Sequence, residues 1–147
     1  MYSILLSTHN VVRWLVLAVG VFAVVRVWRG WMTRAAWTES ETKVLKAYTG
    51  VASLQFVVGI VLYLMSPLVR QGWGDMGAAM RDANLRKFVV EHPLMMIVAV
   101  ALVHIGAGRV RKVTSDSGRY QAATIFWGIA IAITLGFIPW ARPFLPF

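Results

Sequence analysis

The sequence has no cysteine and few acidic residues. The absence of cysteine excludes a disulfide framework, a thiolate metal site and a cysteine nucleophile. Six Asp and Glu stand against fifteen Lys and Arg, which gives a formal net charge of +9. The basic residues flank apolar runs, so we interpret them as determinants of topology and lipid contact and expect no nucleic-acid partner. The sequence also lacks a phosphate-binding loop, a glycine-rich dinucleotide motif and a serine nucleophile elbow.

Apolar residues dominate the composition. They make up 59% of the chain, with a mean hydropathy of +0.66, whereas soluble domains contain about 45–50%. Four apolar runs are long enough to cross a hydrocarbon core of ~30 Å. We therefore predict an all-α integral membrane protein, a four-helix up-and-down bundle in a single domain over residues 1–147, with spans at about 4–28, 45–66, 88–108 and 120–139. The start, MYSILLSTHN, has no basic n-region, so we expect the first span to be retained.

The connection between the second and third spans carries a helical pattern of its own. Val69, Trp73, Met76 and Met80 recur at intervals of four, three and four residues. This spacing predicts a short amphipathic helix that lies on the membrane surface. At the start of the second helix, Thr38 and Glu41 have the spacing of a capping box.

On two spans, small or hydrogen-bonding residues recur at helical spacing along one face. Such faces usually pack against other helices in a membrane bundle. The stripe on the second span consists of Tyr48, Ala52, Gln55, Gly59 and Tyr63, and that on the fourth of Gly128, Ala132 and Gly136. We expect both stripes to pack against neighbouring helices. The tryptophans are expected to be anchors at the membrane surface.

Flanking charge predicts the orientation. The first and third loops hold nine Lys and Arg, and the opposite side holds six when Arg13 and Arg142 are counted. Because the more basic side faces the cytoplasm, we predict that both termini and the amphipathic loop are extracytoplasmic.

Histidines within apolar spans are functional candidates by default. His92 and His104 are twelve residues apart on the third span, which corresponds to about 18 Å in height and roughly 120° in direction. They therefore belong to different sites. His9 and His92 each lie near the start of spans that run in the same direction, so they are expected at the same height. Two axial ligands of one haem require this arrangement.

Arginine and lysine at the same end could pair with haem propionates. Arg13 shares a helix face with His9, and Arg70, Arg86 and Lys87 lie nearby in sequence. With three histidines, the chain allows at most one bis-histidine haem.

Other interpretations remain open at this point. Glu91 could pair with Arg13 in a polar network without a cofactor, or join His9 and His92 in a metal site or proton path. His104 could hydrogen-bond to Tyr48, Thr49 or a backbone carbonyl, or ligate a haem with an unusual or missing sixth partner. A quinone could bind near Trp73 and Trp140, although no motif in the sequence marks such a site.

Several stretches carry a resemblance to a known group. They are STHNVVRW, MSPLVRQGWGDMGAAMRDANLRKFVVEHPLMM, ALVHIG and IPWARP. Together they resemble small bacterial four-helix membrane proteins labelled cytochrome b-like. The resemblance implies haem b held by His9, His92 or His104 in a bacterial cytoplasmic membrane.

A weaker similarity links the chain to the four-helix membrane protoporphyrinogen oxidase family. That family has a lysine in its third span and an Asn-Glu-x-Pro motif at the start of its fourth. Here the third span has Met95 and Met96, and Arg119-Tyr120-Gln121 leads into the fourth.

We therefore expect a b-type haem protein of membrane electron transfer, with His9 and His92 as iron ligands and Arg13 as a propionate partner. Besides the lipid bilayer, its partners would be a quinone or a larger membrane redox complex. The alternatives are a cofactor-free accessory subunit of such a complex and a porphyrinogen oxidase-like enzyme.

Overall fold

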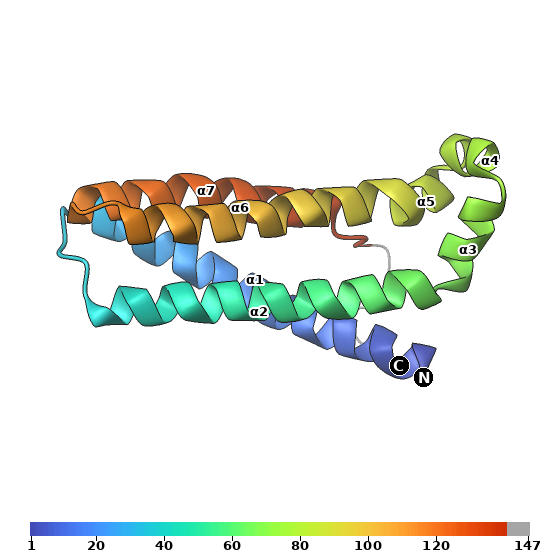
Figure 1. Cartoon of the computed structure of the whole chain (residues 1–147), viewed down its shortest axis with the longest axis horizontal. Coiled ribbons are helices and arrows are strands. Elements are labelled where there is room, and N and C mark those ends of the chain that lie inside the picture. Colours follow the sequence, from blue (N-terminus) through green and yellow to red (C-terminus); the bar gives the residue numbers. More distant parts are fainter. Residues whose placement is uncertain (141–147) are drawn as a thin grey trace.

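Four long helices make up most of the computed structural model, which describes residues 1–140 (Figure 1). They are α1 (Tyr2–Met32), α2 (Glu39–Met65), α6 (His92–Lys112) and α7 (Asp116–Phe137). The short elements between α2 and α6 are α3 (Pro67–Gly74), α4 (Met76–Arg81), α5 (Ala83–Arg86) and a π-helical turn, η1 (Lys87–Glu91). The four long helices are apolar and long enough to cross a membrane, the third such segment being Ala83–Lys112.

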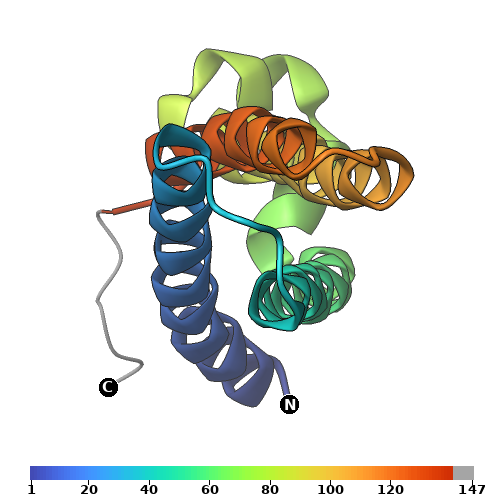
Figure 2. The ribbon, with the colours of Figure 1, turned by 90° about the vertical axis from the view of Figure 1, so that its left-hand side faces the viewer.

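The long helices alternate in direction along the chain. α6 and α7 lie side by side, α2 lies below this pair in the view of Figure 1, and α1 crosses obliquely from the level of α2 to the side of α7 (Figures 1 and 2). α1 contacts α2 and α7, and α2 contacts α6. The start of α1 and the α3–α5 segment lie at one end of the bundle, α7 ends short of it, and the two short loops lie at the other end (Figure 1). The predicted up-and-down helical order is confirmed.

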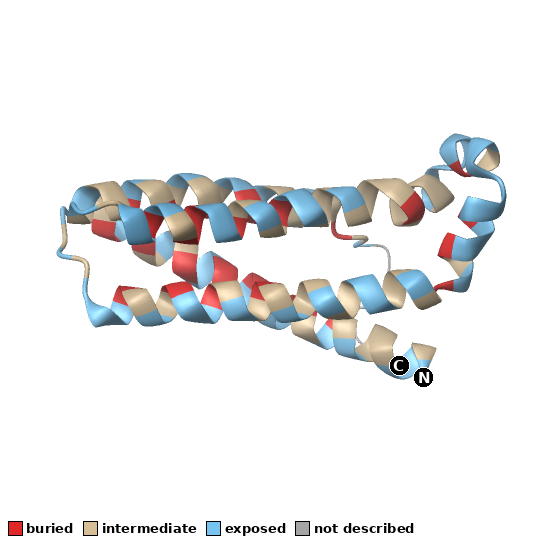
Figure 3. Ribbon diagram, in the orientation of Figure 1, coloured by how far each residue is buried: buried red, intermediate tan, exposed pale blue. Residues whose placement is uncertain are grey.

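The core lies mainly in the half of the bundle near the short loops (Figure 3). Its largest buried side chains include Trp127, Tyr48 and Tyr120. The rings of Tyr48 and Trp127 meet edge to face, with centroids 5.5 Å apart. Trp127 is fully buried and donates a hydrogen bond to the Val103 carbonyl at 3.2 Å. The prediction that the tryptophans are surface anchors is therefore wrong for Trp127, whose indole N–H has a partner inside the bundle.

Glycine allows α6 to approach this tryptophan. A Cβ built on Gly106 would lie 2.7 Å from Phe126 Cβ and 3.0 Å from Trp127 Nε1. The predicted glycine stripe on α7, by contrast, is wrong. Nothing lies within 4 Å of a Cβ at Gly128 or Gly136, because the buried face of α7 is the one that carries Ala123 and Trp127.

The predicted amphipathic helix is divided into three pieces. Asp75 and Asp82 interrupt it, and each side chain caps the helix that follows by accepting a hydrogen bond from a backbone N–H, at 2.9 Å and 2.8 Å respectively. Competing local hydrogen bonds of this kind favour helix starts over helix interiors. Val69 is buried, whereas Trp73 is 53% exposed.

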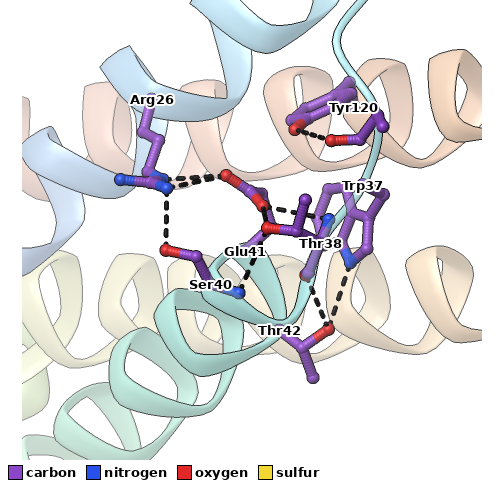
Figure 4. A network of polar contacts seen from close by, with 8 residues as sticks. Arg26, Trp37, Thr38, Ser40, Glu41, Thr42 and Tyr120 are labelled. Carbon is purple, nitrogen blue, oxygen red and sulfur yellow. Dashed lines mark hydrogen bonds and ion pairs between the residues drawn. The ribbon is translucent and has the colours of Figure 1, made fainter.

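A polar network fixes the start of α2 (Figure 4). Glu41 accepts hydrogen bonds from the backbone N–H and the hydroxyl of Thr38, which completes the predicted capping box. Its other oxygen forms an ion pair of 2.9 Å with Arg26 of α1. Glu41 is buried and Arg26 is 37% exposed, so this carboxylate joins α1 to α2 at the edge of the bundle.

We predict that Glu41→Ala lowers the stability of the folded protein by about 1 kcal/mol, because it removes the capping box and the ion-pair partner of the partly exposed Arg26. Thermal unfolding in detergent measures the change. Glu39→Ala is the control, since the ion pair of Glu39 with Lys43 is solvent-exposed. Equal effects of the two substitutions would contradict the account.

Candidate functional site

An apolar cavity of about 480 Å³ lies among α1, α2, α6 and the segment that precedes α6. Most of its lining residues are aliphatic or aromatic. The polar groups that matter for chemistry are His9 and Arg13 from α1, Gln55 and Tyr63 from α2, and His92 from α6. An apolar cavity of about 300–1,000 Å³ with a few convergent polar groups is the usual form of a cofactor or small-molecule site.

His9 and His92 both line this cavity, and their rings lie close to each other. Their ring centroids are 6.4 Å apart, and the ring planes are nearly perpendicular, at 84°. α1 and α6 run in the same direction (Figure 1). The prediction that these two histidines lie at one level is confirmed.

The glutamine of the α2 stripe holds His9. Gln55 Nε2 donates a hydrogen bond to the His9 carbonyl at 3.0 Å and lies 3.3 Å from His9 Nε2. An amide nitrogen only donates hydrogen bonds, so Gln55 Nε2 is the donor both to the His9 carbonyl and to His9 Nε2. A Cβ on Gly59 would lie 3.3 Å from His9 Cε1, so the small residue of the stripe leaves room for the ring. The predicted packing role of the α2 stripe is confirmed.

His92 is oriented by the end of α7. Its Nδ1 lies 3.0 Å from the Phe137 carbonyl oxygen. Because that oxygen only accepts, the proton is assigned to Nδ1, which leaves Nε2 as the nitrogen with a lone pair. A backbone carbonyl on the remote nitrogen is the usual way in which a protein orients a ligating histidine.

The backbone before His92 departs from the α-helix. Pro93 has no N–H, so it cannot hydrogen-bond to the Val89 carbonyl four residues earlier. The Tyr63 hydroxyl donates to that carbonyl at 2.8 Å, and Trp73 Nε1 donates to the Tyr63 oxygen at 3.3 Å. The π-helical turn η1 occupies this position. Such turns are frequent at functional sites.

Arg13 is buried in the cavity wall and is 7% exposed. Its guanidinium carbon lies 5.3 Å from the ring centroid of Trp14. Within residues 1–140, its Nε has no hydrogen-bond partner and the side chain forms no ion pair. The predicted pairing with Glu91 is wrong, because Glu91 forms a 2.7 Å ion pair with Arg86. Arg86, which was predicted to pair with a haem propionate, is therefore paired with Glu91 instead.

His104 lies outside this site. It faces α2, where its Nε2 is 3.0 Å from Ser53 Oγ, and its Nδ1 is 3.0 Å from the Val100 carbonyl. The prediction that His104 hydrogen-bonds to a backbone carbonyl is confirmed by the contact with Val100, whereas the predictions of Tyr48 and Thr49 as its partners are wrong. No trio of His, Asp and Glu in the described part of the chain could hold a metal ion. A site built from His9, His92 and Glu91 is therefore not formed.

Sequence reasoning missed the roles of Gln55 and Tyr63 at the site. The signal for Tyr63 was present, since Pro93 within a span leaves a carbonyl that another residue must satisfy. Which helix supplies that donor depends on packing. Arg142, which entered the charge count, lies outside the described residues.

Comparison with known proteins adds no assignment: no family model, curated protein or solved structure matches this chain.

We predict that Tyr63→Phe raises the rate of hydrogen exchange in residues 87–92 and destabilises the protein by about 1–2 kcal/mol, because the Val89 carbonyl loses the hydrogen bond from the Tyr63 hydroxyl. Hydrogen–deuterium exchange with mass spectrometry measures the first effect. Tyr2→Phe is the control on the same cavity wall. Unchanged protection of residues 87–92 would contradict the proposed role of Tyr63.

Proposed function

We propose that this protein is an integral membrane protein that binds haem b between α1 and α6 and takes part in membrane electron transfer. The observation that carries the proposal is that His9 and His92 both line an apolar cavity and have ring centroids 6.4 Å apart. An imidazole nitrogen bonds a metal ion at about 2 Å, so two imidazoles on opposite sides of one ion have ring centres roughly 6 Å apart. The spacing of His9 and His92 fits this requirement.

The chain's own groups suit the proposed roles. His92 offers Nε2, because its Nδ1 donates to the Phe137 carbonyl. For His9 to offer Nε2, the ring must release the contact with Gln55, while the Gln55 bond to the His9 carbonyl can persist. Arg13 supplies a buried positive charge for a propionate. The apolar wall excludes water, and bound haem b supplies one-electron chemistry at its iron.

The distribution of charge supports one orientation of the protein in the membrane. The end with the two short loops carries the majority of Lys and Arg, so we propose that it faces the cytoplasm of a bacterial cell. The cavity, the α3–α5 segment and the N-terminus then lie toward the outer side. A quinone or a membrane redox complex would exchange electrons there.

A second candidate is a cofactor-free accessory subunit of a larger membrane complex. It is supported by the hydrogen bonds that His9, His92 and His104 make to Gln55, Phe137 and Ser53. Such contacts satisfy buried histidines without any ligand. This candidate predicts a colourless protein that co-purifies with a larger assembly. For the third candidate function, a porphyrinogen oxidase, we assign no proton acceptor among the described residues.

We predict that His9→Ala and His92→Ala each lower the haem content of the purified protein well below that of the wild type, because each removes one axial ligand. The pyridine haemochrome assay measures haem per chain. His104→Ala is the matched control, since it removes a histidine from the same helix as His92 but outside the cavity. Loss of haem in the control alone would contradict the assignment of His9 and His92.

We also predict that Arg13→Gln weakens haem binding by about tenfold or more, since a charge-assisted hydrogen bond contributes about 1.5–3 kcal/mol. Titration of haem-depleted protein with haemin measures the affinity. The control is Arg81→Gln in the exposed α4. An unchanged affinity in Arg13→Gln would mean that Arg13 does not contact the propionates.

A further inference from the structure

A second, smaller groove of about 250 Å³ lies between α2 and α6, toward the end with the short loops. Lys46, Thr49, Gly50 and Ser53 line it from α2, and His104, Ala107 and Arg111 line it from α6. None of these residues lines the large cavity. The groove is therefore a separate site, and the proposed haem plays no part in it.

Two cations project into the groove from opposite helices. Lys46 and Arg111 are both exposed, and within residues 1–140 neither forms an ion pair. Lys43, one turn earlier, is paired with Glu39. No acidic residue lines the groove. At Gly50, nothing lies within 4 Å of an added Cβ, so the groove is open between the two charges.

Hydrogen bonds hold the ring of His104 in the wall of the groove. Ser53 Oγ lies 2.7 Å from the Thr49 carbonyl and 3.0 Å from His104 Nε2, while His104 Nδ1 donates to the Val100 carbonyl. Lys46 and Arg111 offer two positive charges to an anion, and no carboxylate among the residues that line the groove neutralises them.

The surface that continues from the groove toward the middle of the bundle is apolar and exposed. Val57 lies one turn beyond Ser53 on α2 and is 58% exposed, and Ala101, one turn before His104 on α6, is also exposed. An anion with acyl chains would cover this surface, whereas an inorganic anion would not.

We propose that the groove binds the phosphate of an anionic glycerophospholipid between Lys46 and Arg111, with its acyl chains along the exposed faces of α2 and α6. Basic pockets between membrane helices on the cytoplasmic side typically bind such head groups. Inorganic phosphate has the same charged chemistry but lacks the acyl chains.

The test compares two double variants of the full chain that lose the same charge. Lys46→Gln with Arg111→Gln removes both groove cations, and Lys43→Gln with Lys112→Gln removes two cations at the same end outside the groove. Each protein is purified in detergent from membranes that contain phosphatidylglycerol. The retained lipid is measured by mass spectrometry, and the thermal shift is measured with short-chain phosphatidylglycerol, phosphatidylcholine or inorganic phosphate.

The wild type and the control variant are expected to retain phosphatidylglycerol and to be stabilised by it, with little response to phosphatidylcholine. The groove variant is expected to bind it about tenfold or more weakly, since each cation near an anionic lipid contributes about 1 kcal/mol. Equal retention by both double variants would overturn the site. An equal thermal shift with inorganic phosphate would overturn the lipid assignment.

Gly50→Leu provides a second variant that keeps every charge. The added side chain enters open space at the backbone but fills the groove, so it is expected to reduce lipid retention while the fold is preserved. Undiminished retention in a folded Gly50→Leu protein would also overturn the site.

Discussion

A guanidinium inside an apolar bundle is the constraint on which the proposed site depends. Arg13 is 7% exposed, lies beside a cavity of about 480 Å³ and forms no ion pair within residues 1–140. A buried cation without a counter-charge is among the most costly features a helix bundle can contain. The stacking contact with Trp14 offsets only part of that cost. An anionic group in the cavity would remove the remaining cost of burying Arg13, and we therefore propose that a haem propionate lies there.

The same need for polar partners explains the geometry of the histidines. Pro93 leaves the Val89 carbonyl without its helical donor, and Tyr63 from α2 supplies one. The end of α7 orients His92 through the Phe137 carbonyl, and Gln55 holds His9 through its backbone and ring. Each hydrogen bond joins two helices. The distance between the two imidazoles is therefore set by contacts from all four long helices.

Much of the fold could be predicted from the sequence, because hydropathy and capping are local signals. The four long helices, the capping box at Thr38 and the shared level of His9 and His92 follow from spacing alone. The ion-pair partner of Glu91 and the burial of Trp127 could not be predicted from spacing, since each depends on how the elements pack against one another. The division of the α3–α5 segment was missed because the aspartates that cap its pieces also fit the polar face of one helix.

The absorption spectrum of the purified wild-type protein, first oxidised and then reduced with dithionite, tests the central claim most directly. Quantified against protein, it reports whether iron porphyrin is bound and whether two strong axial ligands hold it. The account predicts one low-spin haem b per chain, with sharp reduced α and Soret bands. A folded protein that is colourless and takes up no added haemin would contradict it, and the histidines that line the cavity would then be structural.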